Sequence, residues 1–122
     1  MARILVIDDD AEMRLMLEHI LKLEGYDVVS ASDGREGVKA HRASPSNLVI
    51  TDLFMPNQEG METIAEFRRD FKEVPIIAIC GRPGAFRVLP LAKYLGAIDT
   101  LAKPFQPDEL LTMVKKALRS HP

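Results

Sequence analysis

The chain has 122 residues, of which 47% are hydrophobic and 28% are charged, and these values are typical of one globular domain with a single core. Sixteen Lys and Arg residues against eighteen Asp and Glu residues give a net charge of −2, so no basic excess indicates direct binding to nucleic acid or to an anionic membrane. One cysteine and three histidines exclude a disulfide framework and fall short of a zinc site. Because no apolar run has the length of a membrane-spanning helix or a signal peptide, we expect a cytoplasmic protein.

Short apolar runs recur along the chain and are typical of buried strands. They occupy residues 3–7, 27–31, 47–51, 75–80 and 99–102. Longer segments with apolar positions at helical spacing lie between them. Strands of this composition that alternate with helices predict a parallel sheet that is buried on both faces. We therefore expect residues 1–122 to form a single doubly wound α/β domain, with a five-stranded parallel sheet between two layers of helices.

Capping residues predict where the first two helices begin and end. Asp10 is expected to be the N-cap of the first helix, and Gly25 is expected to end it. Asp33 and Glu36 form a capping-box pair for a short second helix that ends near Ala43.

The later helices are predicted from apolar spacing and from prolines. One face of the third helix carries four apolar side chains, namely Met61, Ile64, Phe67 and Phe71. Pro90 is expected to break a helix that runs from Ala85 and to begin a short helix that ends at Leu95. Pro107 is expected at the first position of a closing helix.

Charged residues stand at the ends of separate predicted strands. Asp8 and Asp9 follow the first strand, Asp52 follows the third and Lys103 follows the fifth. Sites in doubly wound sheets lie beyond the carboxyl ends of the strands, where the strand order reverses, so we expect these side chains to converge. Clustered carboxylates favour a hard divalent cation, and Mg²⁺ prefers such oxygen ligands, while Lys103 would face a phosphoryl group. The alternative for each aspartate is a simple helix cap, which is the role expected for Asp10.

The chain resembles the receiver domains of two-component response regulators, in particular single-domain receivers of the chemotaxis type. The motifs that carry the resemblance are residues 4–10, Asp52 followed by Met55, Pro56 and Gly60, the pair Gly96 and Ala97, and the run Lys103, Pro104 and Phe105. The resemblance implies a flavodoxin-like strand order of 2-1-3-4-5. It also implies that Asp52 is the phosphoacceptor and that Lys103 contacts the acyl phosphate.

The resemblance further implies a cofactor, partners and a backbone feature. The implied Mg²⁺ ligands are Asp8, Asp9, Asp52 and the backbone carbonyl of Phe54, and the peptide bond between Lys103 and Pro104 is implied to be cis. The phosphoryl group would come from a histidine kinase or a histidine phosphotransfer protein. The domain would catalyse only its own phosphorylation and dephosphorylation, and would relay the signal by binding an unknown downstream protein. Since no effector domain follows Pro122, we expect a stand-alone receiver. We also expect it to be a monomer or a weak dimer.

Two residues depart from the family pattern at positions that switch conformation. Cys80 stands where the family has Ser or Thr, and a thiol is a weak hydrogen-bond donor. Thr100 stands where the family has an aromatic residue. We therefore expect phosphorylation chemistry to be retained and the usual conformational response to be weakened. Cys80 could itself be a redox sensor, but a small buried residue is favoured.

Other side chains are assigned from their neighbours in the sequence. Phe54 and Arg82 are expected to cover the phosphoryl group and to slow its hydrolysis, the alternative being that Phe54 only packs on the surface. The three histidines, His19, His41 and His121, are expected to be solvated because they lie on or after helices among charged residues.

Three other functions are weighed against a phosphoacceptor. Cys80 and Thr100 favour a degenerate receiver that acts as a constitutive interaction module, whereas the complete set of acids and Lys103 opposes it. A Mg²⁺-dependent phosphohydrolase would need an acid two residues after Asp52, and Phe54 occupies that position. A flavin or nucleotide carrier would need a glycine-rich loop after the first strand, which the sequence lacks.

Overall fold

The computed structural model describes residues 2–53, 60–81 and 85–120, and for residues 85–89 it describes the backbone only. Strands and helices alternate along the chain as β1 (Arg3–Ile7), α1 (Ala11–Leu23), β2 (Asp27–Ala31), α2 (Gly34–Ala43), β3 (Leu48–Asp52), α3 (Gly60–Asp70), β4 (Ile76–Cys80), α4 (Ala85–Leu95), β5 (Asp99–Ala102) and α5 (Pro107–Ser120). The strands form one parallel sheet in the order β2-β1-β3-β4-β5. The doubly wound fold and the strand order predicted above are confirmed.

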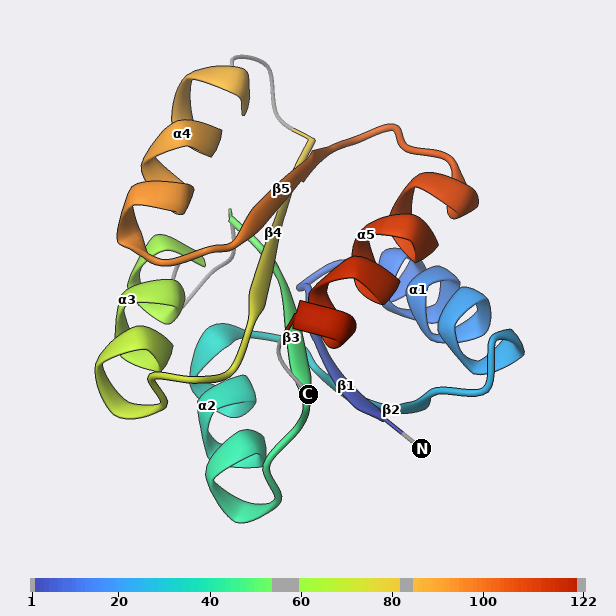
Figure 1. The fold of residues 1–122 in the computed structure, drawn as a ribbon, viewed down its shortest axis with the longest axis horizontal. Helices are drawn as coiled ribbons and strands as arrows, with labels where there is room; N and C mark the ends of the chain where they lie inside the picture. The colour runs from blue at the N-terminus through green and yellow to red at the C-terminus, as the bar shows by residue number, and fades with distance from the viewer. Residues whose placement is uncertain (1, 54–59, 82–84, 121–122) are drawn as a thin grey trace.

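Two hydrophobic cores lie on the two faces of the sheet. The helices α1 and α5 cover one face and α2, α3 and α4 cover the other (Figure 1). Successive side chains of a strand point to opposite faces, so Leu5 and Ile7 of β1 enter the core beneath α2 to α4, while Ile4 and Val6 enter the core beneath α1 and α5. All residues of β3 and β4 are buried. This double burial explains why the strands are continuous apolar runs in the sequence.

The predicted helix caps are confirmed. The Asp10 side chain accepts a hydrogen bond from the Glu12 amide at 3.0 Å, and the Asp33 side chain accepts one from the Glu36 amide at 2.8 Å. Gly25 follows α1 with a φ of +93°, a left-handed conformation that glycine adopts at little cost. These local signals place the first turns of α1 and α2 where the sequence predicts them.

The first helix turns one face to the core and another to solvent. Leu17 and Leu21 are buried, and His19 is exposed as predicted, while the prediction for His121 lies outside the described residues. Within the described part of the chain, no helix combines the length and the apolarity that crossing a bilayer requires.

The fourth helix differs from the sequence prediction. The helix runs from Ala85 to Leu95 and contains Pro90, which was expected to break it. A proline in a helix interior removes one hydrogen bond and crowds the carbonyl four residues earlier, at a cost of about 3 kcal/mol. Pro90 is exposed, whereas Ala92 is fully buried against α3 and the sheet. Packing of α4 on the core outweighs the loss of that hydrogen bond.

The expectation that His41 is solvated is wrong. His41 is 4% exposed, and its ring makes edge contacts with the rings of Phe67 and Phe71 at 5.3 and 4.6 Å between centroids. Its Nδ1 atom accepts a hydrogen bond from the Ser46 amide at 3.1 Å. Since α2 packs directly on α3, the helical position of His41 decides its burial, and the charged neighbours in the sequence do not. Burial lowers the pKa of His41 below its usual value.

Candidate functional site

Three aspartates meet at the carboxyl ends of β1 and β3. The two strands are neighbours, and Ile7 pairs with Thr51, so Asp8 and Asp52 leave the sheet side by side. One carboxylate oxygen each of Asp8, Asp9 and Asp52 lies within 4.8 Å of the others. Asp8 is 1% exposed and Asp52 is 8% exposed, whereas Asp9 faces solvent. The structure thus brings together the acids that the strand ends predict to converge.

The backbone and side chain of Asp8 are held at several points. Its amide donates to the carbonyl of Ala31 at 3.2 Å, and its Oδ1 atom accepts from the Asp10 amide at 2.9 Å. Burial raises the pKa of Asp8, while the Asp10 amide and the ammonium of Lys103 act in the opposite direction and Asp9 adds a smaller upward contribution. A cation in the cluster would therefore stabilise a carboxylate that burial alone disfavours.

Lys103 reaches the acids from the end of β5. Its Nζ atom lies 3.4 Å from Oδ2 of Asp8 and 3.9 Å from Oδ2 of Asp52. Its amide donates to the carbonyl of Cys80 at 2.9 Å, which fixes the start of the lysine side chain against the end of β4. The peptide bond between Lys103 and Pro104 is cis. The ammonium group is thus placed to meet negative charge that develops between the two aspartates.

Two glycines allow neighbouring groups to approach the site closely, because they have no side chain. A Cβ atom on Gly60 would collide with the backbone oxygen of Asp52, so only glycine lets α3 begin this close to the end of β3. A Cβ atom on Gly81 would press on the aliphatic stem of Lys103. The Leu53 amide donates to Oδ1 of Asp52 at 2.8 Å, which orients the carboxylate.

The donor atoms of the cluster fit a magnesium ion. All three side chains offer carboxylate oxygens, which are the ligands that this hard cation prefers. In an octahedron with bonds of about 2.1 Å, neighbouring ligand oxygens are about 3.0 Å apart and opposite ones about 4.2 Å apart, so the three oxygens would move closer together to share one ion. The expected further ligand, the carbonyl of Phe54, lies outside the described residues, as does Arg82. Their predicted roles over the phosphoryl group therefore stay predictions.

Cys80 and Thr100 lie on the same face of the sheet. Cys80 pairs with Ala102 and Thr100 pairs with Ala78, so their side chains point toward the core beneath α4. Cys80 is fully buried, which confirms the expectation of a small core residue and leaves the thiol without solvent access. Thr100 is partly exposed.

Sequence reasoning missed one residue that contacts the site. Arg14 of α1 donates from Nη1 to the backbone oxygen of Asp8 at 2.7 Å. The signal for Arg14 was its position one turn into a helix whose N-cap adjoins the acids; this places its side chain within reach of the strand end.

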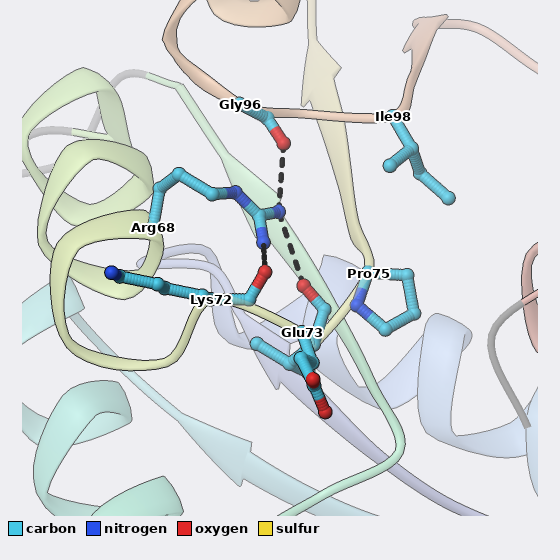
Figure 2. A pocket seen from close by; sticks show the side chains of 7 residues that line it. Arg68, Lys72, Glu73, Pro75, Gly96 and Ile98 are labelled. Carbon is cyan, nitrogen blue, oxygen red and sulfur yellow. Dashed lines mark hydrogen bonds between the residues drawn. The ribbon is translucent and has the colours of Figure 1, made fainter.

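A cavity of about 560 Å³ lies at the opposite end of the sheet. Figure 2 shows its lining residues, among them Pro75 and Ile98, which precede β4 and β5. The guanidinium of Arg68 donates to the carbonyls of Lys72, Val74 and Gly96 at 2.7, 3.1 and 2.8 Å. Arg68 therefore ties together the ends of α3 and α4 and the start of β4. The cavity is separate from the acidic cluster.

Curated proteins with related sequences are longer than this chain. The probable transcriptional regulator ycf27 of Porphyridium aerugineum is 41% identical over 118 residues. The alkaline phosphatase synthesis transcriptional regulatory protein PhoP of Bacillus subtilis (strain 168) is 36% identical over 118 residues. Each alignment covers 96% of this chain and 48% of the relative, so the chain spans about half the length of the curated relatives it matches.

Solved structures of similar length share the fold. A response regulator receiver domain protein from Clostridium thermocellum superposes with a TM-score of 0.92 at 29% identity, covering 98% of this chain and 96% of that one. The chemotaxis protein CheY4 of Vibrio cholerae superposes with a TM-score of 0.88 at 32% identity, covering 97% and 99%. The family model described as the response regulator receiver domain matches residues 4–115. The chain therefore belongs to the response regulator receiver domain family.

Proposed function

We propose that Asp52 accepts a phosphoryl group, with Mg²⁺ held by Asp8, Asp9 and Asp52 and with Lys103 beside the incoming group. The observation that carries this proposal is the convergence of three carboxylate oxygens within 4.8 Å, with the Lys103 ammonium 3.4 Å from Asp8 and 3.9 Å from Asp52. The chain's membership in a phosphoacceptor signalling family supports the same assignment.

The Asp52 carboxylate would act as the nucleophile. An aspartate side chain is ordinarily ionised at neutral pH, so a nucleophilic carboxylate needs no general base. One of its oxygens forms a bond to phosphorus while the bond from phosphorus to the donor's leaving group breaks. Mg²⁺, when bound, neutralises negative charge on the transferring group. Lys103 contributes a second positive charge from the β5 side, and the Leu53 amide keeps the carboxylate oriented.

We propose a histidine kinase or a histidine phosphotransfer protein as the phosphodonor. The first helix begins directly after the acids, and two of its exposed side chains, Leu15 and Met16, are apolar and 66% and 41% exposed. An apolar surface beside a phosphoryl-transfer site suits a protein donor better than a small molecule. The cytoplasmic location expected from the short apolar runs of the sequence stays a prediction.

A constitutive interaction module is the second candidate function. It is favoured by Cys80, whose thiol donates weakly, and by Thr100, which takes the place of the family's aromatic residue. In this case the chain would bind its partner without phosphorylation. The intact set of Asp8, Asp9, Asp52 and Lys103 favours the phosphoacceptor.

Intact mass measured before and after incubation with acetyl phosphate tests the proposal. The wild-type protein should gain one phosphoryl group in the presence of Mg²⁺ and none when Mg²⁺ is chelated. Asp52→Asn should gain none. Asp10→Asn is the matched control, because it removes a neighbouring carboxylate while asparagine still caps α1, and it should be labelled like the wild type. Labelling of Asp52→Asn at the wild-type rate would overturn the assignment, and an unlabelled wild type would favour the interaction module.

A further inference from the structure

Arg14 connects the first turn of α1 to the end of β1. Its Nη1 atom donates to the backbone oxygen of Asp8 at 2.7 Å, and the side chain is partly buried. Its own amide donates to the Asp10 carbonyl at 3.0 Å within the first turn of the helix. The guanidinium therefore reaches back across the loop that carries Asp8, Asp9 and Asp10.

The oxygen that Arg14 holds belongs to the peptide bond between Asp8 and Asp9. On the other side of that loop the Asp8 amide donates to Ala31 of β2 at 3.2 Å. Asp8, the residue that follows β1, is thus fixed from β2 and from α1 at once. The orientation of the following peptide plane sets the direction in which the Asp9 side chain leaves the backbone.

The position of the Asp9 carboxylate depends on the backbone more than the positions of the Asp8 and Asp52 carboxylates do. The side chain of Asp8 contacts the Asp10 amide and Lys103, and the side chain of Asp52 contacts the Leu53 amide and Lys103. For the part of the chain that the structure describes, no hydrogen bond or ion pair holds the carboxylate of Asp9, which is exposed. Its place within 4.8 Å of the other two carboxylates therefore depends on the direction in which the backbone points the side chain.

The charge of Arg14 acts against a cation at this site. A guanidinium near a divalent ion repels it, so on electrostatic grounds removing Arg14 would strengthen Mg²⁺ binding. Loss of the contact with the Asp8 carbonyl would instead loosen the peptide that directs Asp9 and weaken binding. The two effects have opposite signs, so a measured affinity separates them.

We propose that Arg14 is a positioning residue for the metal-binding side of the phosphoryl-transfer site: it holds the peptide between Asp8 and Asp9 so that the Asp9 carboxylate faces Asp8 and Asp52. This inference rests on the proposed function. The hydrogen bond from Arg14 goes to the backbone oxygen of Asp8, so Arg14 acts on the site through the backbone.

Titration of the whole chain with Mg²⁺ alone tests the role of Arg14. The dissociation constant is measured from NMR shifts of the Asp8, Asp9 and Asp10 amides in the wild type, Arg14→Gln and Arg14→Lys. Arg14→Gln should raise the constant about tenfold, which is the lower range for residues that orient metal ligands. The dissociation constant of Arg14→Lys should lie between those of the wild type and Arg14→Gln. Arg42→Gln is the control, since it removes an equal charge from an arginine that pairs with Asp70 away from the site, and it should stay within about twofold of the wild type because screening weakens distant charges.

A second background shows whether Arg14 acts through Asp9. In Asp9→Asn, adding Arg14→Gln should change Mg²⁺ affinity by less than about twofold, because the carboxylate that Arg14 positions is gone. Labelling of Arg14→Gln by acetyl phosphate should be slowed more at low Mg²⁺ than at saturating Mg²⁺, because the variant weakens Mg²⁺ binding and leaves Asp52 and Lys103 in place.

The outcomes separate the inference from the proposed function. Unchanged or tighter Mg²⁺ binding in Arg14→Gln, with the wild type binding Mg²⁺ at Asp8 and Asp9, overturns the positioning role alone. A full effect of Arg14→Gln in the Asp9→Asn background also overturns it. Absence of Mg²⁺ binding by the wild type overturns the proposed function. A thermal unfolding curve shows whether Arg14→Gln is folded. If it is not, the Mg²⁺ dissociation constant of the charge-conserving variant Arg14→Lys is used instead, and a wild-type value in that variant overturns the inference.

Discussion

Gly81 and Lys103 are packed so closely that a side chain on the first would displace the second. A Cβ atom at residue 81 would lie 2.8 Å from Cδ of Lys103 and 2.9 Å from its Cβ. The lysine stem cannot give way easily, because its backbone amide is bonded to the Cys80 carbonyl at 2.9 Å. The absence of a side chain at residue 81 is thus part of the geometry that brings the ammonium within 3.4 Å of Asp8.

We expect Gly81→Ala to slow phosphorylation of the protein by acetyl phosphate about tenfold at saturating Mg²⁺, because a displacement of about 1 Å at a reacting site costs up to about a hundredfold. The readout is the initial rate of mass gain. Phosphorylation of the single variant Lys103→Met should be slower than that of Gly81→Ala. In the Lys103→Met background Gly81→Ala should have no further effect, and an additional tenfold loss there would show that Gly81 acts by another route.

Cys80→Thr should enlarge the conformational response to phosphorylation. The threonine hydroxyl is a stronger donor than the thiol at the end of β4, while the change in volume is small. Amide hydrogen exchange across β4, α4 and β5 is measured with and without beryllofluoride, a phosphoryl mimic. Cys80→Val matches threonine in shape without a donor, and an equal response in Cys80→Val and Cys80→Thr would attribute the effect to packing.

Stability should fall as the pH drops below about 6.5, because the folded protein keeps His41 neutral while the unfolded chain takes up a proton. The contribution of His41 is fully present above the unfolded pKa and is lost as the pH falls toward the lowered folded pKa. Its slope is at most about 1.4 kcal/mol per pH unit. Urea unfolding at about pH 7.5 and about pH 5.5 measures this slope.

His41→Asn should flatten that pH dependence while preserving an acceptor for the Ser46 amide. The comparison is between slopes, because the smaller side chain also lowers stability at every pH. His19→Asn replaces an exposed histidine and should keep the wild-type slope. Equal slopes in the wild type and His41→Asn would contradict the role given to His41.

Leu15→Glu should reduce phosphotransfer from a histidine phosphotransfer domain about tenfold and leave labelling by acetyl phosphate unchanged. Leu15 is 66% exposed near the acids, so a charge there would disturb a docked protein but not a small donor. Leu23→Glu is the matched control, since Leu23 is 75% exposed on the same helix, about 12 Å further along its axis. Similar losses in both variants would show that the whole helix face, and not the end beside the acids, contacts the donor.

Much of the fold follows from local signals. Apolar runs predict the strands because both faces of the sheet are covered, and Asp10 and Asp33 predict helix starts because each satisfies an amide that the helix leaves free. The meeting of Asp8 and Asp52 is predictable because the order reversal of a doubly wound sheet lies between β1 and β3. The chemical roles of these residues stay predictions.

The remaining features depend on contacts between distant segments. The burial of His41 requires α3 to lie against α2, although its spacing from Gly34, Gly37 and Val38 on one helical face was a usable signal. The helix α4 continues past Pro90 because it packs on the core, and helix propensities do not describe such packing. The contact between Arg14 and the Asp8 carbonyl depends on the angle at which α1 leaves β1.

Because the acids come from two strands that are far apart in the sequence, the unfolded chain has no comparable group of oxygens to offer a metal ion. A metal ion that binds this cluster is therefore a ligand of the folded state only, and binding and folding are thermodynamically linked. At a Mg²⁺ concentration of about one hundred times the dissociation constant, the linkage would add about 2.7 kcal/mol to the free energy of unfolding. Calcium tolerates longer bonds and more ligands, and its binding to the cluster would also stabilise the folded state. The rise in melting temperature on adding Mg²⁺ or Ca²⁺ therefore shows which cation the folded cluster binds more tightly.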